Sequence, residues 1–247
     1  MYELQMNLVT DWQDIIINEI KAEGIQYPDT ISKEKLIIGY LEYLRKKGER
    51  KPYNIYKSRE FHCPPEMEKE LNHFIKVLEN GEDRSPYLNK FIDDNKTGND
   101  DMFDHWGILQ VHLHAGNGGP LLLVCFKDDN AYLINVFDHK EQSKKEVLQI
   151  LQNNWPELAE DLKRRRGLNH SGGAAIDTMN YLRIIKGLKI YENFLRKNTD
   201  RIIKQIRNSH IAVPPVLKYK LVKNNSLFII IEENTGHPIL NPIPNNK

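Results

Sequence analysis

The fold of this chain is decided by residues 104–140, where the sequence is DHWGILQVHLHAGNGGPLLLVCFKDDNAYLINVFDHK. Three runs of apolar and β-branched residues alternate here with two short stretches rich in Gly, Asn and Asp. That pattern is typical of strands joined by turns. We therefore expect a three-strand antiparallel meander over about residues 106–139.

The flanking sequence predicts helices, an edge strand and a second hairpin. Apolar residues recur at helical spacing in five segments, which are residues 12–22, 33–47, 63–80, 142–166 and 188–208. Residues 52–57 alternate as an edge strand would. Residues 216–232 predict a hairpin, with an alternating strand before the turn at Asn224-Asn225 and an apolar strand after it. Together these elements predict an α+β protein, with an antiparallel sheet that includes the meander and the C-terminal hairpin and is packed by several helices.

A polar connector separates the helical beginning of the chain from the meander. It covers residues 85–99 and contains Pro86 and Gly98. We expect a mainly helical N-terminal region, residues 1–95, followed by an α+β region with the histidine strands, residues 96–247. The alternative is that both regions form one continuous domain.

The composition is that of an ordinary globular protein. The 247 residues are 40% hydrophobic and 28% charged, with a formal net charge of +1. This balance gives no overall attraction to nucleic acid, so such binding must come from a local patch. No apolar run approaches the roughly 20 residues that cross a bilayer, and the N-terminus lacks the features of a signal peptide. We expect no membrane partner.

The two cysteines, Cys63 and Cys125, are far apart in the sequence and do not form a CxxC pair. Their spacing argues against a disulfide framework and against a cysteine zinc cluster. It fits a reducing compartment, so we expect a cytoplasmic protein.

The meander carries four of the nine histidines, which are His105, His112, His114 and His139. Histidine titrates close to neutral pH, so a cluster of this residue indicates proton transfer or metal binding. Side chains alternate along a strand, and His112 and His114 therefore share a face with Gln110. The opposite face is more apolar. We expect the histidine face to be accessible to solvent.

The strand register decides whether His139 joins the other two histidines, because a slip of one residue reverses the face. With His114 opposite Leu122, all three histidines share a face; with His114 opposite Leu121, Asp138 takes the place of His139. For the second turn we expect Asp129-Asn130 at the tip. That turn would place Phe126 opposite Leu133.

Three interpretations of the histidine strands stay open. The first is a set of polar residues on the wet face of a sheet. The second is a metal-dependent (HxH) hydrolase in which His112, His114 and His139 hold zinc or another divalent ion. The third, which we favour, is cofactor-free RNA cleavage by the same three residues. One neutral histidine would take the proton from a ribose 2′-OH and another would protonate the leaving oxygen.

The densest basic cluster lies after the meander, in the run Lys163-Arg164-Arg165-Arg166. These cations either complement the C-terminal end of a helix or clamp phosphate. His170 follows in a small polar loop. The predicted substrate-binding set is therefore Lys140, Arg164, Arg165, Arg166 and His170.

A second candidate for nucleic-acid contact lies on the predicted edge strand. Tyr53 and Tyr56 alternate with basic residues, namely Lys51, Lys57 and Arg59. Such a strand can stack single-stranded bases on its aromatic rings. An amphipathic edge strand is the other explanation.

The hairpin LLLVCFKDDNAYLINVFDHK resembles the closing strands of RelE- and HigB-type ribonuclease toxins. The resemblance covers residues 121–140 and implies a compact antiparallel sheet with helices that cleaves RNA without a metal. His139 and Lys140 match the basic end of the last strand in that family. A wider pattern, WGI followed by HLH, is similar to an uncharacterised bacterial protein group.

These observations predict a bacterial ribonuclease-like toxin or phage-defence effector that binds RNA. Its protein partner would be a neutralising protein or a second copy of the chain. The non-enzymatic alternative is a protein-binding module of a defence or toxin–antitoxin system, in which the histidine face docks the partner.

Overall fold

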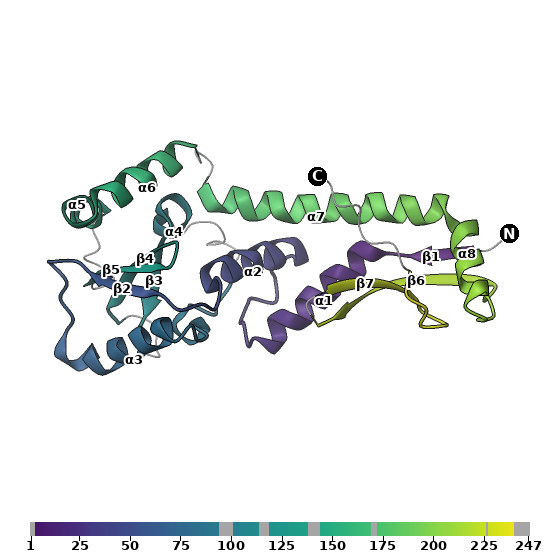
Figure 1. Ribbon diagram of the computed structural model, residues 1–247, viewed down its shortest axis with the longest axis horizontal. Helices are drawn as coiled ribbons and strands as arrows, with labels where there is room; N and C mark the ends of the chain where they lie inside the picture. Colours follow the sequence, from purple (N-terminus) through teal and green to yellow (C-terminus); the bar gives the residue numbers. More distant parts are fainter. Residues whose placement is uncertain are drawn as a thin grey trace. The chain divides into compact units, whose positions relative to one another are not determined.

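The computed structural model describes residues 3–93, 101–113, 119–137, 144–168, 172–225 and 227–239. For Asp101 and for residues 165–168 and 172–175 it describes the backbone alone. Over these ranges the chain forms eight α-helices and two β-sheets (Figure 1). Within the same ranges, no helix has both the length and the apolar character to span a membrane.

The elements form two compact units. Unit 1 contains Met1–Ile25 and Met179–Lys247, and unit 2 contains Gln26–Thr178. Helix α7 (Gly172–Lys197) begins in unit 2 and continues through unit 1. Residues 94–100, around which the sequence placed a boundary, lie outside the described residues. The division after residue 95 therefore stays a prediction.

Unit 2 is built on a four-stranded sheet in the order β2 (Asn54–Lys57), β5 (Asn130–Phe137), β4 (Leu121–Lys127) and β3 (Ile108–His112). Strands β3, β4 and β5 form the predicted antiparallel meander, which is confirmed. Strand β2 is an edge strand, as expected, but it runs parallel to β5. A parallel neighbour needs a crossover in the chain, and α3 lies between the two strands in sequence.

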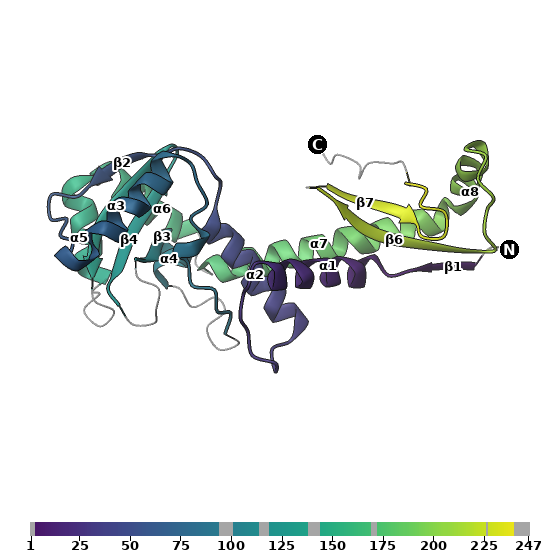
Figure 2. The same cartoon turned by 90° about the horizontal axis from the view of Figure 1, so that it is seen from below.

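Helices cover this sheet on both faces. Figures 1 and 2 show α3 (Glu68–Glu79) on one face and α5 (Lys144–Asn154) and α6 (Pro156–Leu168) on the other. The remaining elements of unit 2 are α2 (Lys33–Lys47), α4 (Asp101–Trp106) and two short 3₁₀ turns, η1 (Pro65–Met67) and η2 (Ser85–Tyr87).

Helix α2 has the bounds that the sequence predicted, because both of its ends carry capping signals. The Ser32 hydroxyl accepts a hydrogen bond from the Lys35 N–H at the first turn. At the other end Gly48 adopts a positive φ of 57°. A hydroxyl at the N-cap and a glycine after the last turn are the residues that these positions favour.

The hairpin between β4 and β5 turns one residue earlier than expected. Lys127 pairs with Asn130, so the tip is Asp128-Asp129, and Phe126 lies opposite Ala131. The predicted pairing of Phe126 with Leu133 is therefore wrong by two residues. Asp128 has a φ of 53°, a left-handed conformation that aspartate tolerates better than most residues. The register shifts once more between Leu123 and Val124.

Unit 1 contains a three-stranded sheet in the order β1 (Glu3–Met6), β6 (Val216–Asn224) and β7 (Leu227–Glu232). The hairpin β6–β7 confirms the predicted C-terminal hairpin. Strand β1 pairs in parallel with β6 and was not expected from its sequence. The helices of this unit are α1 (Leu8–Ala22), α8 (Thr199–Asn208) and the second part of α7. The fold is thus α+β, with two separate sheets.

Candidate functional site

The structure describes only part of the predicted site. His114, His139, Lys140 and His170 lie outside the described residues. Arg165 and Arg166 belong to α6, but their side chains are not described. His112 and Arg164 are the two members whose side chains are placed, so convergence of the full set stays a prediction.

His112 is the last residue of β3 and is partly exposed. It pairs with Leu121, the first residue of β4, which in turn pairs with Phe137, the last residue of β5. Neither predicted register occurs, because Leu121 lies opposite His112, not opposite His114. The connection that follows β3 is longer than a tight turn, and its Gly-rich sequence does not fix a register.

His112, Leu121 and Phe137 form the last row of the sheet, where β3 and β5 end and β4 begins. Neighbouring strands are spaced by roughly 4.8 Å, so the ends of β3 and β5 are separated by about two such spacings. The segments with His114 and His139 begin at these ends. The chain therefore continues toward His114 and toward His139 from strand ends that lie in the same row of the sheet.

The face that carries Gln110 and His112 is not an open, wet face. Leu123 lies opposite Gln110, and Phe137 is in the same row as His112. Both belong to a buried cluster with residues of α4, α5 and α6. The opposite face is equally buried, since Leu122 and Val124 are 0% exposed. The expectation of a wet face is therefore wrong for the sheet as a whole, because Gln110 and His112 on the edge strand β3 are partly exposed but their neighbours are buried.

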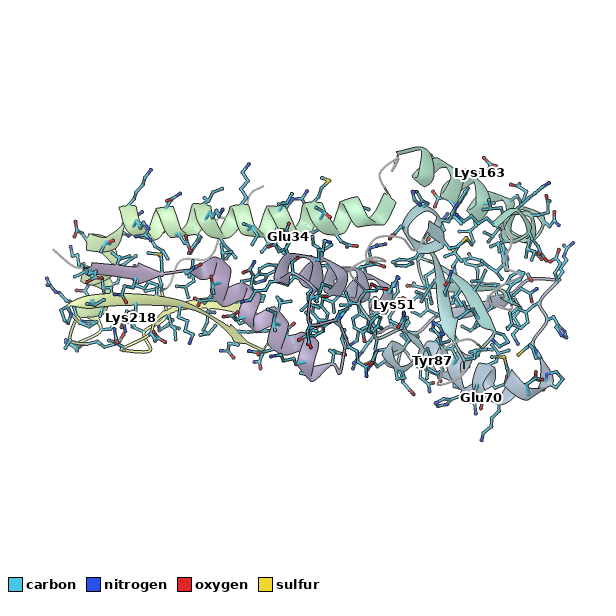
Figure 3. The ribbon with its side chains drawn as sticks, turned by 180° about the vertical axis from the view of Figure 1, so that it is seen from behind. Glu34, Lys51, Glu70, Tyr87, Lys163 and Lys218 are labelled. Atoms are coloured by element: carbon cyan, nitrogen blue, oxygen red, sulfur yellow. The ribbon has the colours of Figure 1, made fainter. Side chains whose placement is uncertain are left out.

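The basic run at the end of α6 is partly neutralised by nearby carboxylates. The Arg164 guanidinium is 2.6 Å from Asp161 Oδ1, and Lys163 Nζ, labelled in Figure 3, is 2.7 Å from Glu160 Oε1. Lys127 Nζ also approaches Asp161, at 3.5 Å. To bind a phosphate, Arg164 would have to leave Asp161, although its side chain is 75% exposed.

The metal alternative needs three ligands of the histidine, cysteine or carboxylate type in one place. In the part of the chain that the structure describes, no group of three such residues is positioned to hold a metal ion. Two of the three ligands that this alternative names, His114 and His139, are not in that part. The metal-dependent alternative stays open.

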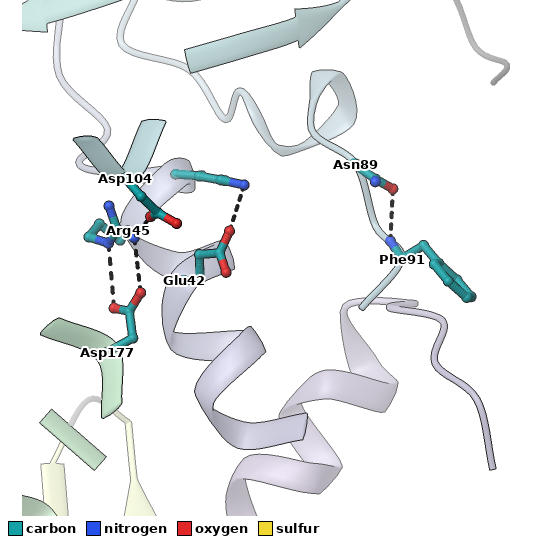
Figure 4. A network of polar contacts seen from close by, with 7 residues as sticks. Glu42, Arg45, Asn89, Phe91, Asp104 and Asp177 are labelled. Carbon is teal, nitrogen blue, oxygen red and sulfur yellow. Dashed lines mark hydrogen bonds and ion pairs between the residues drawn. The ribbon is translucent and has the colours of Figure 1, made fainter. Parts of the chain in front are cut away.

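Sequence reasoning missed a buried ionic network in unit 2 (Figure 4). The Arg45 guanidinium on α2 lies 2.7 Å from Asp104 Oδ1 of α4 and 2.9 Å from Asp177 Oδ2 of α7. The two carboxylates are 1% and 3% exposed. Burial raises the pKa of Asp177 in spite of its bonds to Arg45. Because the charges bind one another, this network joins α2, α4 and α7.

A shallow groove runs along the edge strand β2. Its volume is about 760 Å³, and its lining consists of Lys51, Pro52, Tyr53, Asn54, Ile55, Tyr56, Glu79 and Asp129. Tyr56 is 46% exposed and stacks on Tyr132, with ring centroids 5.5 Å apart. Lys51 forms an ion pair with Asp129 at 2.8 Å. The groove thus offers one exposed aromatic ring beside mixed charges, a combination suited to a single stacked base.

Helix α8 in unit 1 presents a cationic face that the sequence analysis did not single out. Arg201, Lys204 and Arg207 recur every three residues and are exposed. The other side of the helix is anchored by three buried isoleucines, Ile202, Ile203 and Ile206. We call the three exposed cations the α8 cationic face. The i, i+3 spacing of the cations was the signal that could have revealed it.

Comparison with models of protein families, with curated proteins and with solved structures finds no match to this chain.

Proposed function

We propose that this protein is an RNA-cleaving effector of the toxin or phage-defence type that works by histidine acid–base catalysis without a metal. The observation that carries the proposal is the row His112–Leu121–Phe137, because the segments that lead to His114 and His139 both begin at strand ends in this row. Cleavage by two histidines requires their imidazoles on either side of one phosphate, and segments that leave the sheet side by side are compatible with this arrangement.

In the proposed reaction, one neutral histidine of the set His112, His114 and His139 removes the proton from a ribose 2′-OH. The resulting oxyanion attacks the adjacent phosphorus, and a second, protonated histidine gives its proton to the departing 5′ oxygen. The products are a cyclic phosphate and a free 5′-hydroxyl end. Lys140 and the arginines that end α6 would stabilise the negative charge on the phosphorane.

Two described features support RNA as the substrate. The α8 cationic face can follow a phosphate backbone, because its three exposed cations are presented on one side of one helix. The exposed ring of Tyr56 can stack a base. The near-zero net charge of the whole chain requires local features of this kind.

The test is cleavage of a fluorescently labelled single-stranded RNA by the purified full-length protein. We expect His112→Ala and His139→Ala each to lower the rate by roughly 10² to 10⁴-fold, the usual contribution of a general acid or base. His73→Ala is the matched control, because His73 is exposed on α3. Thermal melting should show that all three variants remain folded.

The cleavage assay separates the alternatives. EDTA should leave the rate unchanged, and a loss of activity that zinc restores would favour the metal-dependent hydrolase. Undiminished cleavage by the variants of His112 and His139 would contradict the acid–base assignment. Absence of RNA cleavage by the unaltered protein would favour the non-enzymatic binding module.

A further inference from the structure

One side of helix α7 in unit 1 exposes large apolar side chains to solvent. Met179 is 57% exposed, Leu182 is 53% exposed and Ile190 is 59% exposed. With Lys186 between them, their spacing is three, four and four residues, which places them along one side of a helix. Figure 3 shows side chains standing out from α7. Exposed apolar patches with a polar rim mark interaction sites more often than single scattered apolar residues do.

The opposite side of the same helix is already used within unit 1. The Tyr181 ring lies 5.9 Å from the Trp12 ring, and its hydroxyl accepts a hydrogen bond from the Gln13 amide at 3.0 Å. Glu192 Oε1 accepts a hydrogen bond from the Leu8 N–H at 2.7 Å. Leu195 is completely buried. Packing of the unit therefore fixes α7 in rotation, with the apolar row outward.

The exposed side of α7 is also strongly cationic. From residue 179 to residue 197 the helix has one acidic residue, Glu192, which is bonded to Leu8. Its five cations are all exposed, and they are Arg183, Lys186, Lys189, Arg196 and Lys197. We call the six residues Met179, Leu182, Arg183, Lys186, Lys189 and Ile190 the α7 stripe. It combines apolar contacts with uniformly positive charge.

We propose that the α7 stripe is the docking surface for an acidic amphipathic helix of a protein partner. Such a helix would cover Met179, Leu182 and Ile190 with its apolar side, and its flanking carboxylates would lie opposite the lysines and the arginine. The geometry is that of helix-on-helix recognition, in which anchors recur every three or four residues. Charge complementarity selects the partner and accelerates the encounter.

Three other occupants fit the stripe less well. RNA would bind the cations but would leave three exposed apolar side chains against phosphate and ribose. A second copy of the stripe would bring like charges together, because the exposed side of α7 has no acid. On a lipid surface Lys186, in the middle of the apolar row, would have to extend to the headgroups, whereas a partner helix can place a carboxylate opposite it. An acidic amphipathic helix satisfies both properties at once, and this proposal does not depend on RNA cleavage.

The test measures binding of a synthetic helical peptide to the full-length protein by fluorescence anisotropy. The peptide carries leucines along one side and glutamates on both flanks. A scrambled peptide of the same composition lacks the apolar side, and a third peptide has lysines in place of the glutamates. We expect binding of the first peptide and at least about tenfold weaker binding of the other two.

Two pairs of variants locate the binding site. Leu182→Gln with Ile190→Gln, and separately Lys186→Glu with Lys189→Glu, should each weaken binding of the acidic peptide by about tenfold or more. The matched apolar control is Leu227→Gln, since Leu227 is 68% exposed on β7. The matched charge control is Lys69→Glu with Lys76→Glu on the exposed side of α3. The controls should change affinity less than about twofold.

Several results would overturn the proposal. No binding of the acidic peptide, or equal binding of the scrambled peptide, would remove the amphipathic partner. Binding of oligouridine that depends on Lys186 and Lys189 but not on Leu182 and Ile190 would assign the stripe to RNA. Adsorption to phosphatidylglycerol vesicles without peptide binding would assign it to lipid. A dimer in sedimentation that the Leu182 and Ile190 variant dissociates would assign it to a second copy.

Discussion

Strand β4 of unit 2 and strand β6 of unit 1 present their residues in opposite ways. In β4, every residue from Leu121 to Cys125 is buried. In β6, buried Leu217, Tyr219 and Leu221 alternate with exposed residues. A continuous apolar run indicates a sheet covered on both faces, and alternation indicates a sheet covered on one. The burial pattern of a central strand therefore indicates whether its sheet is covered on one face or on both, which the polar residues of the edge strand β3 did not.

The largest difference between the two sheets should appear in the free energy of unfolding when a single leucine is replaced in each. Leu122→Ala removes a side chain that is 0% exposed in β4, and we expect a loss of about 3 kcal/mol in the free energy of unfolding. Leu227→Ala on β7, where the leucine is 68% exposed, should change that free energy by less than about 0.5 kcal/mol. Urea denaturation monitors both. Equal losses would mean that the two sheets do not differ in coverage.

A smaller effect should distinguish two glycines with the same backbone conformation, one in each unit. Gly24 and Gly81 both have a φ of +68°, but only at Gly81 would a Cβ meet a neighbour, at 2.7 Å from the Lys51 carbonyl carbon. We expect Gly24→Ala to cost about 1 kcal/mol from backbone strain alone. Gly81→Ala should cost about twice as much or more, because the clash adds to the strain.

Thermal melting of both glycine variants checks the comparison. A melting temperature that falls equally in the two variants would show that the close approach between Gly81 and Lys51 is relaxed at little cost. The Lys51 backbone leads directly into β2, so a strong effect at Gly81 would tie the edge strand to the end of α3.

The smallest effect should appear in the pH dependence of two buried carboxylates. Burial raises the pKa of Asp177 in unit 2. Burial also acts on Glu232 in unit 1, but hydrogen bonds from the Lys218 N–H and from Thr235 outweigh it and lower the pKa. A lowered carboxyl pKa stabilises the fold above the unfolded pKa and loses that contribution as pH falls. A raised pKa works in the opposite direction.

Two isosteric variants measure these signs. Glu232→Gln should lose about 1 kcal/mol near neutral pH, and the deficit should shrink as pH falls below 4.5, the ordinary pKa of a glutamate. For Asp177→Asn, the free energy of unfolding should instead improve relative to the unaltered protein as pH rises above 3.8, the ordinary pKa of an aspartate. Chemical denaturation over a pH series gives both differences. Slopes of the same sign would contradict the assigned environments.

Local patterns predicted the elements that depend on neighbouring residues. The meander, the C-terminal hairpin and α2 follow from alternation, turn residues and caps, which act over a few positions. Strand β1 has only four residues, and its partner β6 begins at Val216. Nothing within β1 itself distinguishes it from a short irregular segment, so its pairing could not be predicted.

The candidate site shows the same limit. The sequence correctly placed His112 on a strand, but the two registers it allowed were wrong because the long connection after β3 does not fix the pairing. In the Arg45 network, Arg45 is separated in sequence by 59 residues from Asp104 and by 132 residues from Asp177. Single charged residues at such distances carry no periodic signal. The apolar row of α7 does have helical spacing, yet the packing of unit 1 decides which side faces outward.

The division of unit 1 between the two ends of the chain has a consequence for biosynthesis. The whole of Gln26–Thr178 leaves the ribosome before β6 and β7 do, so the four-stranded sheet can be complete while β1 still lacks its neighbour. Domains generally fold as units during synthesis, from the N-terminal side onward. Here unit 2 can fold first, and β1 can pair only after β6 has been synthesised.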